Sequence, residues 1–218
     1  MANHLDLEEQ EQLDQIKHFW KQYGNAITWC LIAVLGAFAA WNGYQYWQRS
    51  QAAQAAAMYD EIEKVTGSGD TAKLERAFSE MKDRFASTAY AQQSALVVAK
   101  TLYAAGQVDG AKSALVWASE KSSDKGVASI AKLRLSAVLM DAKSYDEALK
   151  VLGGGVGEEF AGLLADRRGD IFATQGKKSD AKAEYQKAYK AFEDRSDYRR
   201  LVEVKLNAMG VNPSEGSK

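Results

Sequence analysis

The chain has 218 residues and a formal net charge of −1, and 46% of its residues are hydrophobic. This length suits one soluble domain with an appendage. The single cysteine excludes a disulfide framework, and the basic residues form no stripe interleaved with aromatic residues, so nucleic acid is not an expected partner. The one proline, Pro213, lies near the C-terminus, and helix-forming residues dominate after residue 50. The composition therefore predicts an all-α protein.

The chain begins with a short acidic segment, residues 1–25, with five acidic side chains against two lysines. Leu13, Ile16, Trp20 and Tyr23 recur on one helical face that runs directly into an apolar stretch. Such a face either lies on a membrane surface or lengthens a membrane anchor. We expect the second.

Residues 26–47 contain no charged side chain and would form a helix about 33 Å long, close to the thickness of a bilayer core. Tryptophan and tyrosine side chains flank both ends, as they do at membrane interfaces. The pattern favours a transmembrane helix in the lipid bilayer over a buried core helix. A cleaved signal peptide is an alternative, because Ala37-Phe38-Ala39 resembles a cleavage site, but the preceding segment is acidic rather than basic.

The flanking charges bear on the orientation of this helix. Lys17 and Lys21 precede it and Arg49 follows it, which favours a cytoplasmic N-terminus by one charge. Within the helix, Gly36, Ala40 and Gly43 share a face on which another helix could approach closely. We expect this face to contact a partner helix in the membrane.

Residues 48–218 alternate helical stretches of about 14 residues with short polar turns, which predicts antiparallel helix pairs. One stretch closely resembles a tetratricopeptide repeat, with Gly169, Phe172, Gly176, Ala181, Tyr185 and Ala188 at the pattern positions. The same frame falls on Ala99, Leu102, Gly106, Ala111, Leu115 and Ala118, and a looser copy uses Leu135, Ser136, Leu139, Ala148 and Leu152. The small residues are expected where paired helices cross closely, and the large ones where they fill gaps between pairs.

The large domain offers little for catalysis. Both histidines precede the apolar helix, so residues 48–218 contain neither a histidine base nor a cysteine nucleophile. We expect no catalytic site, no metal and no cofactor. The glycine-rich stretch 153–157 lacks the Lys-Ser/Thr of a phosphate loop and is expected to be a connector. The enzyme alternative is a hydrolase that uses paired carboxylates such as Asp166 and Asp170.

Binding is the natural use of stacked helix pairs, because their first helices line a groove. The positions that generally line this groove in tetratricopeptide repeats correspond here to Gln93, Leu96, Lys100, Tyr103, Leu133, Ala137, Met140, Asp166, Asp170 and Ala173. A groove that mixes apolar, flexible and charged side chains suits extended or partly folded polypeptide. The alternative is that several of these side chains only pack against neighbouring helices.

The order of segments resembles one bacterial family over essentially the whole chain. An acidic N-terminus and one apolar helix that ends in Tyr-x-Tyr-Trp precede TAYAQQSALVVAK, IAKLRLSAVLMDAKSYDEALKVL, ADRRGDIFATQGKKSDAKAEY and LVEVKLNAMG. This layout resembles the YfgM-like family, the ancillary subunit of the SecYEG translocon.

The resemblance implies a bacterial inner-membrane protein with its N-terminus in the cytoplasm and a periplasmic repeat domain, residues 48–218. It implies three kinds of partner: the translocon, a membrane-anchored periplasmic chaperone of the prolyl-isomerase type, and unfolded exported polypeptides. The implied function is to help newly translocated proteins reach periplasmic chaperones. An adaptor for envelope complex assembly, unrelated to secretion, is the alternative function.

Overall fold

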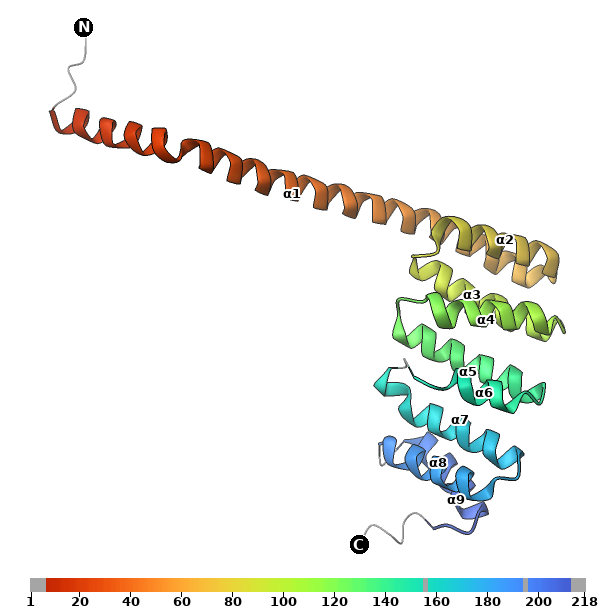
Figure 1. Ribbon diagram of the computed structural model, residues 1–218. Helices are drawn as coiled ribbons and strands as arrows, with labels where there is room; N and C mark the ends of the chain where they lie inside the picture. Colours follow the sequence, from red (N-terminus) through yellow and green to blue (C-terminus); the bar gives the residue numbers. More distant parts are fainter. Residues whose placement is uncertain (1–6, 155–156, 194–195, 213–218) are drawn as a thin grey trace. The chain divides into compact units, whose positions relative to one another are not determined.

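The computed structural model describes residues 7–154, 157–193 and 196–212. Its regular structure within these ranges is helical: α1 (Leu7–Ser68), α2 (Thr71–Phe85), α3 (Ala89–Ala104), α4 (Val108–Lys121), α5 (Lys125–Asp141), α6 (Tyr145–Val151), the 3-10 turn η1 (Glu158–Phe160), α7 (Ala161–Thr174), α8 (Lys178–Ala191) and α9 (Asp197–Ala208) (Figure 1). The all-α prediction is confirmed. Residues 1–6 of the acidic segment and two residues of the glycine-rich connector, 155–156, lie outside the described residues.

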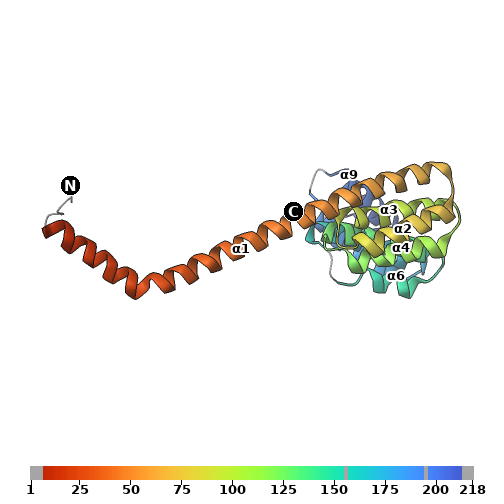
Figure 2. The same ribbon diagram turned by 90° about the horizontal axis from the view of Figure 1, so that it is seen from above.

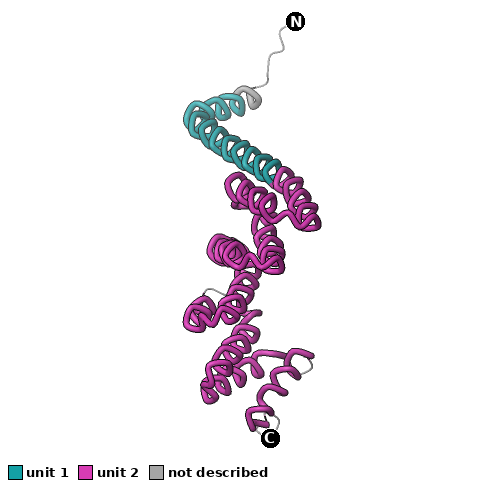
Figure 3. The backbone as a smooth tube through the Cα atoms, turned by 90° about the vertical axis from the view of Figure 1, so that its right-hand side faces the viewer, with its two compact units in different colours: residues 1–51 teal, residues 52–218 magenta. Residues whose placement is uncertain are grey.

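The chain divides into two compact units, residues 1–51 and residues 52–218 (Figure 3). The first contains most of α1, and its apolar side chains are exposed; Trp29, Phe38 and Trp41 are each more than 60% exposed. By length and composition α1 is able to cross a membrane, and only 6% of its most apolar window is buried. This is the reverse of a soluble core helix, whose apolar side chains are covered by protein.

Within this first unit α1 is not straight. Figure 2 shows a bend in its N-terminal part, drawn in red. Thr28 Oγ1 donates a hydrogen bond of 2.7 Å to the carbonyl oxygen of Gly24. A threonine that bonds to the carbonyl four residues before it often bends a helix, and this pair lies in the N-terminal part of α1.

The second unit stacks its helices as antiparallel pairs, α3 with α4, α5 with α6, and α7 with α8 (Figure 1). The three pairs turn in the same way. In each, a residue with positive φ follows the first helix, namely Gly106, Lys143 and Gly176, and the next N–H returns to a carbonyl five residues back at 2.8–2.9 Å. Glycine is the usual residue in this left-handed position because it lacks a Cβ. The middle repeat has Lys143 there instead, which explains why its sequence match is looser.

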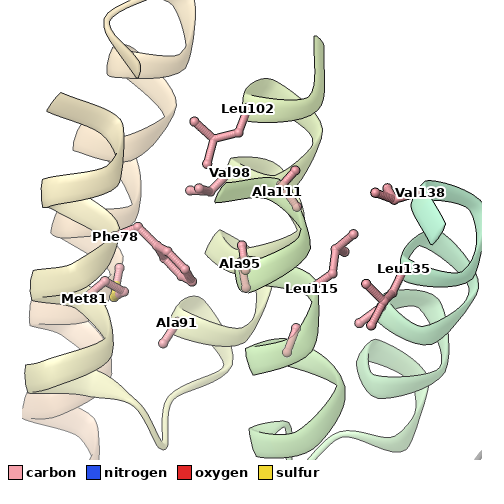
Figure 4. Close-up of a cluster of buried hydrophobic side chains, with 14 of the residues drawn as sticks. Phe78, Met81, Ala91, Ala95, Val98, Leu102, Ala111, Leu115, Leu135 and Val138 are labelled. Atoms are coloured by element: carbon pink, nitrogen blue, oxygen red, sulfur yellow. The ribbon is translucent and has the colours of Figure 1, made fainter. Parts of the chain in front are cut away.

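Buried side chains from successive helices form one core through most of the stack. Figure 4 shows Phe78 of α2 facing Ala91 and Ala95 of α3, and Leu115 of α4 facing Leu135 of α5. The last 17 residues of α1 join this core through Ala55, Ile62 and Val65. Alternation of alanine with large aliphatic residues lets neighbouring helices interdigitate without voids.

A second buried cluster holds the C-terminal end of the stack, between α7, α8 and α9. Its tightest point is Gly169, where a Cβ would lie 2.5 Å from two ring carbons of Tyr185. Only a glycine permits α7 and α8 to cross at this distance. The hydroxyl of Tyr185 then donates to Asp170 at 2.8 Å, so the same aromatic residue fills the gap and binds its neighbour.

Candidate protein-binding groove

Two cavities, of about 310 and 570 Å³, lie along the first helices of the two leading repeats, α3 and α5. They share Lys100 of α3 and Arg134 of α5, so they form one continuous surface, which we call the α3–α5 groove. The smaller cavity is lined by Ala99, Lys100, Tyr103, Leu115, Arg134, Ala137, Val138 and Asp141. The larger is lined by Tyr59, Thr66, Gly67, Gln93, Leu96, Val97, Lys100, Thr101 and Arg134.

The smaller cavity has an apolar floor and a polar rim. Ala99, Ala137 and Val138 form part of the floor, and Tyr103 is 40% exposed at the edge. The Tyr103 hydroxyl donates a hydrogen bond of 2.5 Å to Asp141, which ties α3 to α5 at this end of the groove. That hydrogen bond raises the pKa of Tyr103 above its usual value, because losing the proton would place two negative charges together.

The two shared side chains give the groove its charge. The Nη1 group of Arg134 donates to the carbonyl oxygen of Leu96 at 3.1 Å, which holds the guanidinium across the groove. Within the described ranges, neither Lys100 nor Arg134 forms an ion pair. The cavities that they share are lined by one carboxylate, Asp141, which already accepts from Tyr103. The groove therefore carries surplus positive charge above an apolar floor.

Five of the ten side chains that we expected in the groove line it: Gln93, Leu96, Lys100, Tyr103 and Ala137. Leu133 and Met140 are half-buried, pack against the main core and line neither cavity. The residues expected on α3 thus line the two cavities, whereas on α5 the cavity-lining face is rotated by about one residue from the expected one. Arg134, Val138 and Asp141 occupy the positions that Leu133 and Met140 were expected to hold.

The remaining three expected groove residues lie elsewhere, in the α7–α9 region. Asp166 is 2% exposed, and its carboxylate accepts from Lys205 Nζ at 2.7 and 2.9 Å and from the Tyr198 hydroxyl at 3.2 Å. Asp170 accepts from the same lysine at 2.7 Å. Ala173 lines a separate cavity with Lys205 and Met209.

The expectation for the last repeat therefore differs from the structure, and the reason is α9. This helix packs against α7 and α8, and its Lys205 forms ion pairs with both aspartates at 2.7 Å. Burial raises the pKa of Asp166 above its usual value, although the hydrogen bond from Lys205 acts in the opposite direction. The two carboxylates of the enzyme alternative therefore hold a helix in place. In the described ranges no group of three or more His, Cys, Asp or Glu side chains could hold a metal ion.

Groove residues that the sequence did not predict lie on two helices, α5 and the end of α1. Arg134 and Asp141 lie seven residues apart, on one face of α5 with Ala137 and Val138, so a helical wheel of α5 alone could have grouped them. Tyr59 belongs to the end of α1, outside any recognisable repeat, and no sequence signal placed it beside α3.

The other predicted residues are placed as follows. Ala99, Leu102, Ala111, Ala148, Ala181, Tyr185 and Ala188 are buried, as is Gly169, and Phe172 is half-buried against the second cluster. On α1, the face of Gly36, Ala40 and Gly43 is exposed, and nothing lies within 4 Å of a Cβ built on either glycine. That face is open to another helix.

Comparison with known proteins agrees with the fold. Residues 17–211 match the family described as Tetratricopeptide repeat-like domain. The chain is 31% identical to the ancillary SecYEG translocon subunit of Neisseria gonorrhoeae, over 96% of this chain and the whole of that protein. Its counterparts in Haemophilus influenzae and Escherichia coli are 30% and 23% identical, over 92% and 93% of this chain and 97% of each relative. Since the similarity extends over the apolar helix and all the repeats, the chain belongs to the YfgM-like family of ancillary SecYEG translocon subunits.

Proposed function

We propose that this protein is a membrane-anchored scaffold at the SecYEG translocon, where its α3–α5 groove binds extended segments of newly translocated polypeptides. Residues 26–47 of α1 cross the bacterial inner membrane with the N-terminus in the cytoplasm, and the repeats lie in the periplasm. The groove then hands its clients to a membrane-anchored periplasmic chaperone of the prolyl-isomerase type. The names of the relatives support the translocon as partner.

The observation that carries the binding role is the combination of an apolar floor with two cations, Lys100 and Arg134, that form no ion pair with any residue that the structure describes. An extended peptide can bury one apolar side chain in the smaller cavity while a neighbouring carboxylate meets Lys100 or Arg134. Clients with acidic residues beside apolar ones should therefore bind best.

Charge reversal tests the groove. Lys100→Glu combined with Arg134→Glu should weaken binding of a fluorescent acidic–apolar peptide about tenfold, since each exposed charge contact contributes up to about 1 kcal/mol. The matched control is Lys121→Glu combined with Lys190→Glu, two exposed lysines in the last turns of α4 and α8 and outside both cavities, which should leave the affinity unchanged. Equal losses in both variants would mean that net charge acts at long range and that the groove is not the site.

Photocrosslinking tests the translocon role. A photoreactive residue at Tyr103 should capture a chain arrested during translocation, and one at Ala40, on the small-residue face of α1, should capture a membrane component of the translocon. Adducts at Ala40 with envelope proteins alone would support the adaptor function instead.

Orientation has its own test. In a Cys30→Ser background, a cysteine at the exposed Ser113 should react with a membrane-impermeant maleimide in spheroplasts. Reaction only after lysis would place the repeats in the cytoplasm and refute the periplasmic role.

A further inference from the structure

The segment of α1 before the apolar span is strongly amphipathic. At 100° per residue, Leu13, Ile16, Phe19, Trp20 and Tyr23 fall within one arc of the helix. All five side chains are exposed; Ile16 is 65% exposed and Trp20 59%. The opposite face carries Glu11, His18 and Gln22. In the described part of the chain no protein side chain covers this apolar arc.

Between this segment and the span, Gly24 has two contacts of the kind at which helices bend. Trp20 lies over Gly24, where a Cβ would be 3.1 Å from two atoms of the indole, and the carbonyl of Gly24 accepts from Thr28. Both the indole of Trp20 and the hydroxyl of Thr28 therefore contact Gly24, which lies two residues before the span begins. Helices bend at such features, and Figure 2 shows that α1 does so in this part.

We propose that residues 11–23 form an interfacial helix that lies in the plane of the membrane, with its apolar arc in the boundary between headgroups and acyl chains. This inference rests on the proposed membrane anchor and concerns the segment that precedes residues 26–47. From the sequence alone we expected this segment to lengthen the anchor in a straight line. The occupant of the apolar arc is lipid, because the arc runs directly into residues 26–47.

Length argues against a straight extension. Residues 26–47 already span about 33 Å, which matches the hydrocarbon core. A further 13 residues along the same axis would reach about 20 Å beyond it and leave Leu13, Ile16 and Phe19 in water. A bend near Gly24 instead lays the arc on the acyl boundary, where tryptophan and tyrosine rings prefer to be.

The charges fit the same placement. Lys17 lies beside one edge of the apolar arc, where its stem can cover lipid while the amine reaches phosphate groups. Lys17 also forms an ion pair with Asp14, on the polar face, at 3.1 Å. Glu11 and His18 face the solvent.

Site-directed spin labelling of the full chain tests this placement. Single cysteines at residues 11–23 would be introduced in the Cys30→Ser background, labelled, and reconstituted into vesicles of phosphatidylethanolamine and phosphatidylglycerol. Accessibility to oxygen and to a water-soluble nickel chelate would then be measured at each site. The expected result is a helical period throughout, with Leu13, Ile16, Trp20 and Tyr23 at one shallow depth in lipid and His18 and Gln22 in water.

Two results would overturn the inference. If the depth of the spin label in the bilayer decreases steadily from Tyr23 to Leu13, equally on both faces, residues 11–23 extend the span in a straight line. An apolar arc that is fully accessible to nickel would mean that its partner is a protein rather than lipid. A label at Val34 separates these failures from failure of the anchor itself, because it must be deep in the bilayer if residues 26–47 cross it.

A matched pair of substitutions adds a second readout. With the label at Leu13, Ile16→Asp should raise nickel accessibility several-fold, because a carboxylate on the apolar arc expels the segment from the interface. Gln22→Asp adds the same charge on the polar face and should leave the label in place. Equal effects of the two substitutions would contradict the in-plane orientation.

Discussion

Replacing Gly169 by alanine adds one methyl group where α7 and α8 cross. Two opposing effects decide the outcome. Alanine in a helix interior is favoured over glycine by about 1 kcal/mol. Against this, the new Cβ would lie 2.5 Å from Cδ1 and Cε1 of Tyr185. Overpacking of this kind costs about 1–3 kcal/mol.

The ring of Tyr185 has little freedom to move away. It is 3% exposed, and its hydroxyl is bound to Asp170. We therefore expect the upper part of the overpacking range, and a net loss of about 1–2 kcal/mol in the free energy of unfolding. Urea unfolding of the full chain in a non-ionic detergent, followed by circular dichroism at a helix-sensitive wavelength, measures this change.

Two further variants isolate the cause. Gly67→Ala, in the last turn of α1, meets nothing within 4 Å and should raise the stability by up to about 1 kcal/mol. In a Tyr185→Leu background, Gly169→Ala should lose most of its cost, because the ring atoms that it strikes are gone. If Gly169→Ala stabilises the protein as Gly67→Ala does, or costs the same in both backgrounds, the close crossing is not the reason for the glycine.

Three other predictions follow from the repeat domain. Lys143→Gly should raise the stability by up to about 1 kcal/mol, because φ is 59° there and glycine adopts this conformation freely; a urea midpoint that falls would refute this. Lys205→Met should lower the stability by about 2–3 kcal/mol, since it leaves the Asp166 carboxylate buried without its cation, whereas Lys190→Met, on the exposed surface at the end of α8, should have almost no effect. Burial, together with the nearby Asp166, raises the pKa of Tyr198 from 10.0 to about 12, so its contribution to stability is complete below pH 10 and is lost as the pH rises to about 12. The difference in stability between wild type and Tyr198→Phe should therefore be constant below pH 10 and change as the pH rises to about 12, and a difference that stays constant through that window would contradict this assignment.

Sequence patterns alone determined the helical class, the long apolar helix and the repeat register. These features are local: an uncharged stretch long enough for a bilayer, and small residues such as Ala111 and Ala181 at a nearly constant period, need no knowledge of distant contacts. The same register predicted the face of α3 that lines the two cavities. The turn residues Gly106 and Gly176 also kept their expected places.

Tertiary structure decided where the groove ends and which side chains give it charge. Arg134 enters the groove because α5 is rotated relative to the repeat frame, and the packing of its whole face sets that rotation. Asp166 and Asp170 leave the groove because α9 lies beside α7 and supplies Lys205, whose position 35 or more residues later in the chain gives no local signal. Periodicity reports which residues share a helix face, whereas the neighbour that covers this face depends on how helices distant in sequence pack together.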